Sequence, residues 1–595
     1  MSFLGAFVST LFQRPGRAVE ALFWYALGKR QRARNRLRIG AAQSRHAYQQ
    51  WIAQVEQPNK ALAKAEAAIA QWPRRPRLSV LLYQQPGLPP AQVKRSFDAL
   101  SAQCYPDWEL ILVQSYEMPP PRALGVPRLT LAPSRAGSLA QALGIGAEVA
   151  RGEYLLPLAS DAVLSPLALY RLAEAALAHP EASVLYGDHD YLVGAARAHP
   201  WFKPAWNPDM FLAQDYISQA CLLKLSAMRQ ALPVDVMLAD AAAYALVLAM
   251  SAAPGARLVH VPHVLATVTG ALPWARPAAE QAARVAAAAR QLAPQGARAE
   301  AGAWGAVQVE WPLPDPLPLV SIIIPTRDRV DLLSRAVLGV VSATRYRAME
   351  VLIVDNGSTD PKTLAYLERI AGNPKVRVLR WDHPFNYAAI NNFAAHEARG
   401  AYLCLLNNDV EIIDENWLMA LVRQAARPEV GAAGAKLLYE DGTVQHAGVV
   451  VGMGDAAGHA HRFERNDQPG YFAQIHITRA ASAVTGACLV VARARYFEVG
   501  GLDEERFKVA FNDVDFCLRL EEAGYRNIYE PRAVLVHHES RSRQRDFAPA
   551  QIERYRAELA ALQTRWGTVG YADPLHHPQL DPSCERYLLR LPQLA

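Results

Sequence analysis

Two stretches of sequence decide the fold: residues 319–325 read Leu-Val-Ser-Ile-Ile-Ile-Pro, and residues 349–355 read Met-Glu-Val-Leu-Ile-Val-Asp. Each is a short apolar run rich in β-branched residues, which is typical of a strand buried on both faces. A helical pattern separates them, and residues 402–406 (Tyr-Leu-Cys-Leu-Leu) form a third such run. Strands that alternate with helices predict an α/β fold with a mainly parallel sheet, whose ligands bind at the carboxyl ends of the strands.

The same pattern occurs earlier in the chain. Residues 77–82 and 108–113 are similar apolar runs, and residues 150–155 (Ala-Arg-Gly-Glu-Tyr-Leu) match residues 398–403 (Ala-Arg-Gly-Ala-Tyr-Leu). The matching segments lie about 240 to 250 residues apart, and self-similarity at a fixed spacing is typical of an internal duplication. The sequence therefore predicts two tandem α/β units with helical segments at both ends.

Proline and alanine usage divides the chain further. Residues 275–301 are rich in alanine, and residues 311–318 (Trp-Pro-Leu-Pro-Asp-Pro-Leu-Pro) predict a stiff hinge. The expected segments are a helical basic leader (1–75), the first α/β unit (76–270), a helix and Pro-rich linker (271–316), the second α/β unit (317–545) and a C-terminal helical tail (546–595).

Charge and cysteine usage exclude several classes of protein. The 595 residues carry a net charge of +6, and nine Lys or Arg stand against the single acid Glu20 between Arg14 and Arg45. The remainder is close to neutral, so we expect no nucleic-acid partner. Six scattered cysteines predict buried thiols in a reducing compartment. No run approaches the ~20 apolar residues that a membrane-spanning helix needs.

The first 45 residues combine aromatic and apolar residues with a following run of cations. This pattern favours a helix that lies on an anionic membrane surface. An ordinary helix packed on the protein is the alternative. We therefore expect a cytoplasmic protein, peripheral on the inner face of the cytoplasmic membrane.

Acids and amides follow the strands of the second unit. Asp355 ends the strand at 349–355 and could meet a nucleotide, although a local helix cap is the competing interpretation. Asn407-Asn408-Asp409 follows the strand at 402–406. Mg²⁺ and Mn²⁺ select hard oxygen ligands, so Asp409 could share such an ion with a diphosphate. A strand-end turn would look similar.

A second acidic segment begins a helical pattern. Asn512-Asp513-Val514-Asp515 precedes an apolar-periodic stretch, which favours a carboxylate at the helix start. Asp513 is the candidate general base, and helix capping or packing is the favoured role for Asp515. His537-His538 follows an apolar strand, so one imidazole could add a metal ligand. Isolated histidine pairs are more often structural.

Together these segments resemble the family-2 inverting glycosyltransferases, especially rhamnosyltransferase-like tandem-domain enzymes of bacterial O-antigen and surface polysaccharide biosynthesis. The resemblance covers residues 318–545 and rests on VSIIIPTRDR, VLIVDNGSTD, FNYAAINNFAAHEARGAYLCLLNNDV, DGTVQHAGVV, VTGACLVVARARYFEVGGLDEERF, AFNDVDFCLRL and VLVHHESRSR. It implies two GT-A-type, Rossmann-like domains and a Mn²⁺ or Mg²⁺ cofactor. The family's strand-end motif commonly carries more than one acid, whereas Asn407 and Asn408 stand here.

The resemblance also implies roles for individual residues. Asp513 would be the catalytic base, and the metal would be held by Asp409, His537 and His538. The donor would meet Pro325, Thr326, Arg327, Asp355, Asn392, Asn408 and Gly486. The acceptor would meet Asp515, Trp417, Gln445 and His446, with Trp417 equally at home in the core. The expected partners are a UDP- or dTDP-sugar donor, a glycan or lipid-linked glycan acceptor, and a second copy of the chain.

The first unit resembles the same family more faintly, and its chemistry is thinner. Gln114 stands where Asp355 stands in the second unit, Asp240 is the one candidate for a displaced base, and Ala266-Thr267 takes the place of His537. We therefore expect the first unit to be inactive. Asp188 and Asp190 are interpreted as solvated turn acids, and His576-His577 as a surface loop.

Three alternatives remain open at this stage. Both units could be active in a bifunctional transferase, or both could serve only glycan binding or assembly. A sugar-nucleotide pyrophosphorylase would need a Gly-rich phosphate loop after the first strand. Residues 325–329 (Pro-Thr-Arg-Asp-Arg) contain no such loop.

Overall fold

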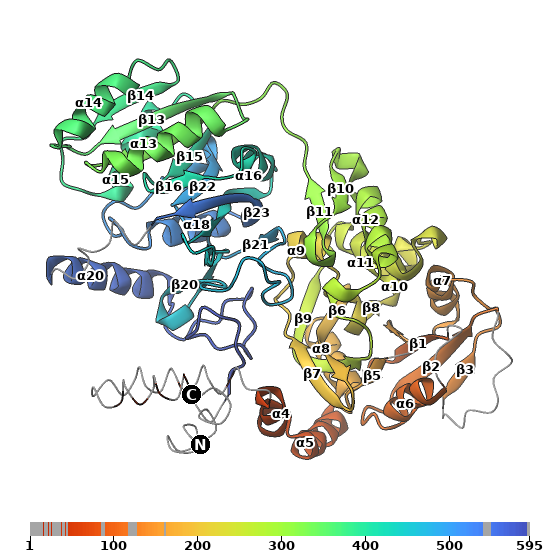
Figure 1. Ribbon diagram of the computed structural model, residues 1–595. Coiled ribbons are helices and arrows are strands. Elements are labelled where there is room, and N and C mark those ends of the chain that lie inside the picture. Colours follow the sequence, from red (N-terminus) through yellow and green to blue (C-terminus); the bar gives the residue numbers. More distant parts are fainter. Residues whose placement is uncertain are drawn as a thin grey trace.

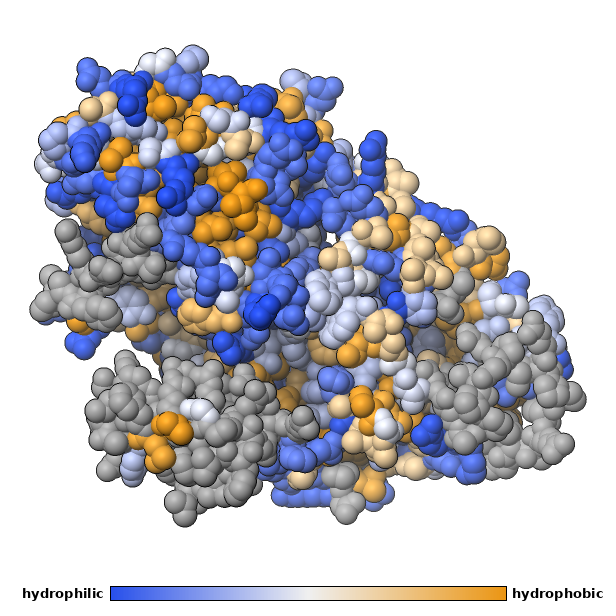
Figure 2. Space-filling model, in the orientation of Figure 1, coloured by the Kyte–Doolittle hydropathy of each residue, from blue (hydrophilic) through white to orange (hydrophobic). Residues whose placement is uncertain are grey.

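The computed structural model describes residues 46–84, 90–116, 128–159, 162–538 and 549–591, with a few isolated positions before residue 46. Two α/β units lie side by side, and the chain crosses from one to the other through β10, β11 and an extended linker (Figure 1). The expected membrane contact of residues 1–45 falls almost wholly outside the described residues. Among the residues that the structure describes, no helix is long and apolar enough to cross a membrane. On the face drawn in Figure 2, hydrophobic residues form separate patches among hydrophilic ones.

The second unit is built on a mixed sheet with the strand order β14-β13-β12-β15-β22-β17-β23-β16. Strands β12 to β15 run parallel, and β22 lies antiparallel between β15 and β17. The strands of this sheet are β12 (Val320–Thr326), β13 (Met349–Asp355), β14 (Val376–Arg380), β15 (Tyr402–Leu406), β16 (Val410–Ile412), β17 (Val430–Leu438), β22 (Cys488–Ala492) and β23 (Arg526–His537), with β18 (Val444–His446) and β21 (Arg479–Ala480) at its side. Strands β19 (Val449–Val451) and β20 (Ala457–His459) form a separate ribbon.

The first unit repeats this sheet in the order β3-β2-β1-β4-β8-β6-β9-β5. Its strands are β1 (Leu78–Gln84), β2 (Trp108–Gln114), β3 (Leu129–Leu131), β4 (Tyr154–Leu158), β5 (Ala162–Leu164), β6 (Val184–Val193), β7 (Ala196–Trp201), β8 (Cys221–Lys224) and β9 (Leu258–Val268). Each strand has a counterpart at the same place in the other sheet, and β7, which pairs with β6, corresponds to β18, which pairs with β17. The predicted fold class, two tandem α/β units with mainly parallel sheets, is confirmed.

Helices cover the sheets and both ends of the chain. Those of the leader and the first unit are α4 (Ala47–Trp51), a π-helix (Ile52–Glu56), α5 (Pro58–Gln71), α6 (Pro90–Ser101), α7 (Leu139–Val149), α8 (Ala168–Ala178), α9 (Pro208–Ala213), α10 (Leu225–Ala231) and α11 (Ala242–Ala252). Those of the second unit and tail are α13 (Val330–Leu338), α14 (Pro361–Ile370), α15 (Tyr387–Glu397), α16 (Trp417–Ala425), α17 (Arg493–Glu498), α18 (Asn512–Glu522) and α20 (Pro549–Trp566).

Side-chain alternation along the strands explains why the second sheet is buried on both faces. In β12, Val320, Ile322 and Ile324 join a core with α13, α14 and α16, whereas Ile323 joins a core with α15 and α18 on the other face. Successive side chains of a strand point to opposite faces, so an unbroken apolar run is needed where helices cover both. The run of isoleucines therefore fits a central strand.

A buried hydrogen-bond network is duplicated with the fold. Ser321 Oγ donates to Glu350 Oε1 at 2.6 Å and accepts the N–H of Gly400 at 2.8 Å. In the first unit Ser79, Glu109 and Gly152 make the same two bonds at 2.7 and 2.9 Å. A Cβ on Gly400 would lie 2.6 Å from the Ser321 nitrogen, so only glycine fits this approach.

The segment between the units differs in part from the expected helix and linker. Helix α12 (Ala278–Leu292) is present, and it is followed by a hairpin of β10 (Arg298–Ala301) and β11 (Val307–Glu310). The hairpin was not predicted, because its alanine-rich first strand has a low intrinsic preference for β structure. Trp311 instead packs in a small core with the hairpin and α12.

Residues 201–209 of the first unit form much of the contact with the second unit. Asp209 Oδ1 pairs with Arg427 Nη1 at 2.7 Å and Asp209 Oδ2 with Arg526 Nε at 3.2 Å. The Asn207 side chain bonds both the N–H and the carbonyl of Ala480 at 3.1 and 3.0 Å. Trp201 stacks on Phe472 with ring centroids 4.3 Å apart. These contacts are buried and polar as well as aromatic, so they fix one relative orientation of the units.

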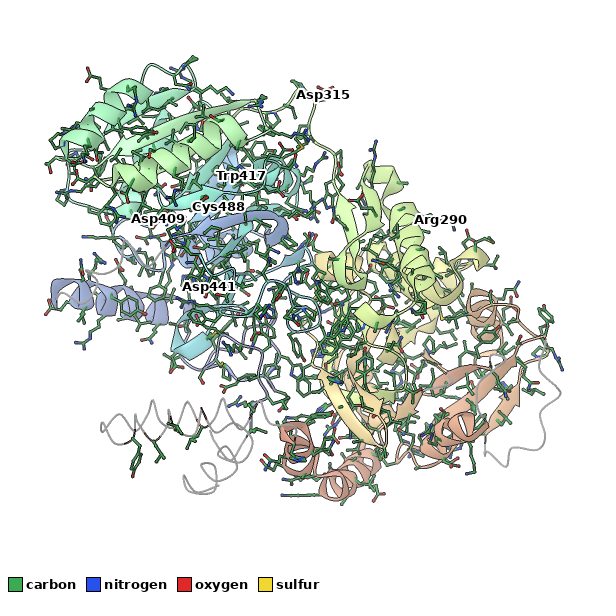
Figure 3. The ribbon with its side chains drawn as sticks, in the orientation of Figure 1. Arg290, Asp315, Asp409, Trp417, Asp441 and Cys488 are labelled. Carbon is green, nitrogen blue, oxygen red and sulfur yellow. The ribbon has the colours of Figure 1, made fainter. Side chains whose placement is uncertain are left out.

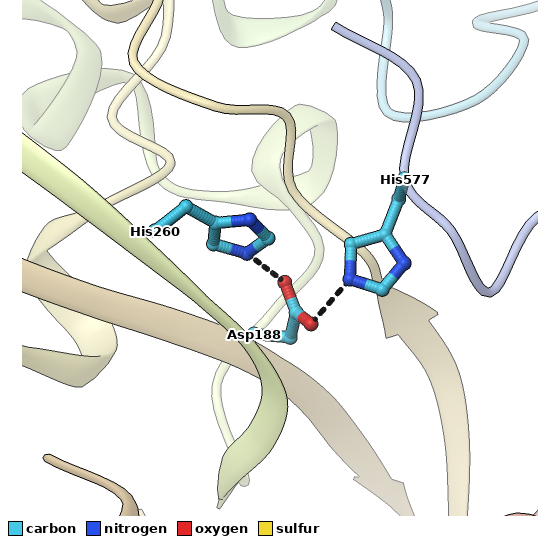
Figure 4. A group of neighbouring side chains, drawn as sticks. All are labelled: Asp188, His260 and His577. Carbon is cyan, nitrogen blue, oxygen red and sulfur yellow. Dashed lines mark hydrogen bonds and ion pairs between the residues drawn. The ribbon is translucent and has the colours of Figure 1, made fainter. Parts of the chain in front are cut away.

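A buried histidine of the C-terminal tail contacts the first unit. This contact corrects the expectations for His576-His577 and for Asp188 and Asp190. His576 and His577 are not a surface loop, since they are 5% and 2% exposed. Asp188 and Asp190 are not solvated turn acids, since both are fully buried in β6. In Figure 4 the Asp188 carboxylate lies between the imidazoles of His260 and His577, at 2.9 and 2.8 Å.

The Asp188 cluster has the residue types of a metal site, but its hydrogen bonds assign it another role. The Gln579 N–H donates to His577 Nδ1 at 3.0 Å, so Nε2 is the ring nitrogen that faces the Asp188 carboxylate, 2.8 Å from its Oδ2. Burial raises the pKa of Asp188, but the two imidazoles outweigh burial and hold that pKa well below its usual range. The cluster therefore connects the tail to the first unit through close contacts of one buried carboxylate with two imidazoles.

Candidate functional site

The carboxyl end of β15 meets the carboxyl end of β23 in the second unit. Strand β16 follows Asp409 directly and pairs antiparallel with β23, with Val410 opposite His537. This register brings the Asp409 carboxylate beside the His537 imidazole, and Asp409 Oδ1 lies 3.0 Å from His537 Nε2. Both side chains are largely buried. Figure 3 labels Asp409 close to Cys488, at the neighbouring strand β22.

Gln445 determines how His537 presents its ring. His537 Nδ1 lies 2.6 Å from Gln445 Oε1, which accepts a hydrogen bond, so Nδ1 carries the proton. The other nitrogen, Nε2, then offers its lone pair on the side of Asp409. An imidazole lone pair beside a carboxylate oxygen is a donor set that suits a divalent cation, and an acceptor on the second ring nitrogen is the usual support for a histidine ligand. The residues thus fit a metal held by Asp409 and His537.

Asp513 reaches the same region from the start of α18. Its Oδ2 accepts the N–H of Gly486 at 2.9 Å, and its side chain is half-buried. The loop that contains Gly486 is in turn bonded to the strand end, because the Asn407 N–H donates to the Ala487 carbonyl at 3.0 Å. One short loop therefore separates the metal-site residues from the candidate base.

Tyr387, at the start of α15, is affected by the charges of both Asp513 and Asp409. Its hydroxyl donates to the Gly486 carbonyl at 2.9 Å. Burial and then the charge of Asp513, with a smaller contribution from Asp409, raise the pKa of Tyr387 above its usual range. Tyr387 was not among the residues predicted from sequence. Its place after Asn386, whose side chain caps α15, was the available signal.

The residues expected to bind the donor line the ends of β12 and β13. Asp355 is buried, accepts the Ser358 N–H at 3.0 Å and pairs with Arg380 at 3.2 Å. Asn408 donates to Thr326 Oγ1 at 3.1 Å, Pro325 lies beside Val354 in β13, and Arg327 is exposed after the strand end. Asp355 thus stabilises the turn after β13, whereas the cap of α14 is Asp360. The contact of Asp355 to the nucleotide stays a prediction.

Asn392 has a different role from the expected donor contact. Its oxygen accepts from the Leu502 N–H at 2.9 Å and the Tyr496 hydroxyl at 2.6 Å, and its amide donates to Leu502 O and Glu504. The hydrogen-bonding groups of this side chain are thus engaged in stabilising the loop at residues 500–504. This placement corrects the prediction for Asn392.

Two residues expected at the acceptor are inside the protein. Asp515 is fully buried and bonds Arg519, Arg565 and the Trp566 indole at 2.9 to 3.1 Å, so it connects α18 to α20. Trp417 is also fully buried, in the core beneath α16, and its indole donates to Thr344 at 3.0 Å. Neither leaves a surface for a sugar. The capping and core interpretations of these residues are the correct ones.

The expected histidines separate into different environments. His446 is fully buried, and its Nδ1 lies 2.8 Å from His459 Nδ1. Burial, with His459 next, holds the pKa of His446 well below its usual range. His538 turns away from Asp409 and lies between Glu411 and Glu440. His446 therefore offers no group to an acceptor, and His538 no ligand to the metal.

In the first unit, Asp161 stands in the sequence at the place of Asp409, but the equivalent of His537 is lost. Strand β5 pairs with β9 so that Ala162 lies opposite Val268, as Val410 lies opposite His537. Val268, rather than Ala266 or Thr267, therefore takes the place of His537. Asp161 lies outside the described residues, and so does the side chain of Asp240.

Comparisons with known proteins show which chains this one is similar to. Residues 321–476 match the family model described as glycosyl transferase family 2. A chain of Sinorhizobium fredii described as uncharacterized is 36% identical over 529 residues, which cover 85% of this chain and 58% of that one. The O-antigen biosynthesis protein RfbC of Myxococcus xanthus is 38% identical over 550 residues, 90% of this chain and 42% of that protein. The chain thus spans about half the length of these relatives.

A solved structure is similar over a smaller part of the chain. It is a mannosyltransferase from Pyrobaculum calidifontis in complex with GDP-Man and Mn²⁺. The match covers 45% of this chain and 69% of that one, at 19% identity and a TM-score of 0.33.

Proposed function

We propose that the chain, which belongs to glycosyl transferase family 2 through its second unit, is an inverting glycosyltransferase. Its catalytic site is formed by Asp409, His537 and Asp513. The donor is a UDP- or dTDP-sugar, and the acceptor is a growing bacterial surface glycan. The single observation that carries the proposal is the convergence of these three side chains around one loop. A glycan-binding protein would have no need of that arrangement.

Asp513 acts as the general base. It takes the proton of an acceptor hydroxyl as that oxygen attacks the anomeric carbon of the donor sugar. The nucleoside diphosphate leaves from the opposite face, so the configuration at that carbon inverts. The Gly486 N–H donates to Oδ2 and the Val514 N–H donates to Oδ1, both at 2.9 Å, and these two bonds hold the carboxylate in position for the acceptor.

Asp409 and His537 would hold a Mn²⁺ or Mg²⁺ ion. When bound, the ion supplies a positive charge that stabilises the departing diphosphate. Gln445 keeps the His537 lone pair directed to the ion, and Asp355 and Asn408 lie at the strand ends where the nucleotide would bind.

The similarity to a protein of O-antigen biosynthesis supports a surface glycan, free or lipid-linked, as the acceptor. The cationic residues before residue 46 support work at the inner face of the cytoplasmic membrane. The replacement of His537 by Val268 and of Asp513 by Ala243 in the first unit supports a single active site.

A donor-binding experiment tests the proposal first. We expect UDP- or dTDP-sugar with Mn²⁺ to stabilise the wild type by about 2.7 kcal/mol at 100 times the dissociation constant. Asp409→Asn should lose the metal-dependent part of this shift, since its amide oxygen is a poorer ligand. Asp467→Asn is the matched control, because Asp467 is exposed and pairs with Arg465.

A transfer assay then tests the base. Asp513→Asn should lower kcat by about 10²–10⁴-fold, the usual contribution of a general base, while donor stabilisation is retained. The anomeric configuration of the wild-type product, read by NMR, should be opposite to that of the donor. Retention of configuration would contradict the mechanism. Absence of any donor shift would favour a non-catalytic glycan-binding protein.

A further inference from the structure

The first unit contains a cavity where the second unit has its candidate catalytic site. Its volume is about 380 Å³, within the range of small-molecule sites. Strand ends, the start of α11 and helix α12 enclose it. Residues that line it include Pro157, Ala159, Ser218, Ala243, Val268 and Arg284.

The cavity is the duplicate of the catalytic site with the equivalents of His537 and Asp513 replaced. Val268 takes the place of His537 in the strand register. Ala243 is the second residue of α11, as Asp513 is the second residue of α18. Ala159 follows β4 as Asn407 follows β15. At these three positions, small or apolar side chains replace a metal ligand, a base and a strand-end amide.

New polar groups line the same cavity. Helix α12 and the turn before it contribute Arg276, Glu280 and Arg284, and Asp215 comes from the opposite side. Arg284 is 7% exposed, and its nearest carboxylate oxygen, on Glu280, is 3.7 Å away, beyond hydrogen-bond distance. Burial, and next the charge of Arg276, lower the pKa of Arg284. A buried guanidinium held in this way is available to a ligand.

Ser218 gives an independent sign of a ligand. It is 8% exposed and lines the cavity, and its Oγ has no hydrogen-bond partner among the described residues. Buried hydroxyl groups are almost always hydrogen-bonded, so an unpartnered one at a cavity wall indicates that something else bonds it. A water molecule would satisfy the Ser218 hydroxyl, but it would not explain why the cavity has kept its volume after the equivalents of His537 and Asp513 were replaced.

We propose that this cavity is a non-catalytic site for a neutral sugar unit of the growing glycan. Among the described residues of the lining, two cations (Arg276 and Arg284) and two acids (Asp215 and Glu280) balance, with Tyr191 and apolar side chains beside them. Sugar hydroxyls both donate and accept, so they use both kinds of group, whereas a nucleoside diphosphate needs an excess of cations or a metal. The inference rests on the proposed function, because it takes the acceptor glycan as its ligand.

Sugar binding to the full-length protein tests the proposal. The probes are neutral disaccharides of rhamnose, galactose, glucose and N-acetylglucosamine, followed by ligand-observed NMR without donor or metal. At least one should bind the wild type, and Ala243→Trp, which fills the cavity, should weaken it at least tenfold. Ala252→Trp is the matched control, because Ala252 is exposed at the other end of α11. Arg284→Gln is the second variant, with the same expected loss, should Ala243→Trp not fold.

The possible results separate this inference from the proposed function. Metal-dependent hydrolysis of the donor reports on the second unit alone and should be unchanged in Ala243→Trp, whereas KM for a long acceptor should rise. Binding that survives both Ala243→Trp and Arg284→Gln in folded protein would overturn the sugar site, as would absence of binding to the wild type. If the wild type binds sugar but does not hydrolyse any donor, the proposed transferase activity is wrong and the proposed sugar site is supported.

Discussion

Gln445 acts on the metal site through His537. Because Gln445 Oε1 accepts the Nδ1 proton at 2.6 Å, it determines which ring nitrogen faces Asp409. Gln445→Ala should therefore lower Mn²⁺ affinity about 10–100-fold, the usual effect of removing the partner of a histidine ligand. Calorimetry or Mn²⁺ electron paramagnetic resonance measures this without any turnover.

The conservative variant separates orientation from packing. Gln445→Glu keeps an oxygen acceptor next to Nδ1, so we expect its Mn²⁺ affinity to be at least that of the wild type. If Gln445→Ala and Gln445→Glu lose affinity equally, Gln445 has only a packing role and the tautomer argument is wrong.

The sequence predicted some residues of the site better than others. Asp409, Asp513 and His537 follow strand ends or begin a helix, so local pattern was enough to select them. Asn392, Asp515 and Trp417 are in equally regular positions, but distant partners such as Leu502, Trp566 and Thr344 decide their roles. One sequence does not tell which residues meet across such separations.

At the scale of elements, Asp515 holds two helices together. Its carboxylate is fully buried and bonds Arg519 of α18, and Arg565 and Trp566 of α20. Asp515→Ala should destabilise the second unit by about 3–5 kcal/mol, because it leaves guanidinium groups without their partner in a buried network. The midpoint of urea unfolding, followed by tryptophan fluorescence, checks this value.

Acceptor kinetics decide between the two roles that sequence suggested for Asp515. At a temperature where Asp515→Ala is folded, KM for the acceptor should equal that of the wild type. A raised KM with normal stability would restore the predicted acceptor contact. Asp467→Ala provides the baseline, since an exposed pair contributes only about 0–1 kcal/mol.

Element order was the most predictable property of the fold. Apolar runs predicted β12, β13 and β15 and their earlier copies, because buried parallel strands need unbroken hydrophobicity. The hairpin of β10 and β11 was not predicted, because Ala299 and Ala301 have little preference for strands. Tertiary packing around Trp311 overrides that preference.

At the scale of the whole molecule, the segment at residues 201–209 makes the two units one body. The sequence alone did not indicate what this segment touches. Its aromatic residues meet Tyr471 and Phe472, and Asp209 meets two arginines of the second unit. A degenerate unit kept for structure and sugar binding would need such a fixed contact to deliver its ligand to the same active site.

Asp209 gives this contact a pH dependence. Burial raises the pKa of Asp209, but Arg427 and Arg526 outweigh burial and hold that pKa below its usual range. A carboxyl group with a lowered folded pKa contributes stability above its unfolded pKa of about 3.9, and this contribution is lost as pH falls through the folded value. The contact should therefore be at full strength at neutral pH and weaken below about pH 4.

Asp209→Ala should reproduce that loss at neutral pH. It leaves Arg427 buried without its closest carboxylate, so we expect calorimetry to resolve two melting transitions where the wild type shows one. Asp467→Ala should leave a single transition. Small-angle scattering should show a larger radius of gyration for Asp209→Ala, while donor hydrolysis, which needs only the second unit, persists. A single transition and unchanged radius would mean that the aromatic contacts alone hold the units together.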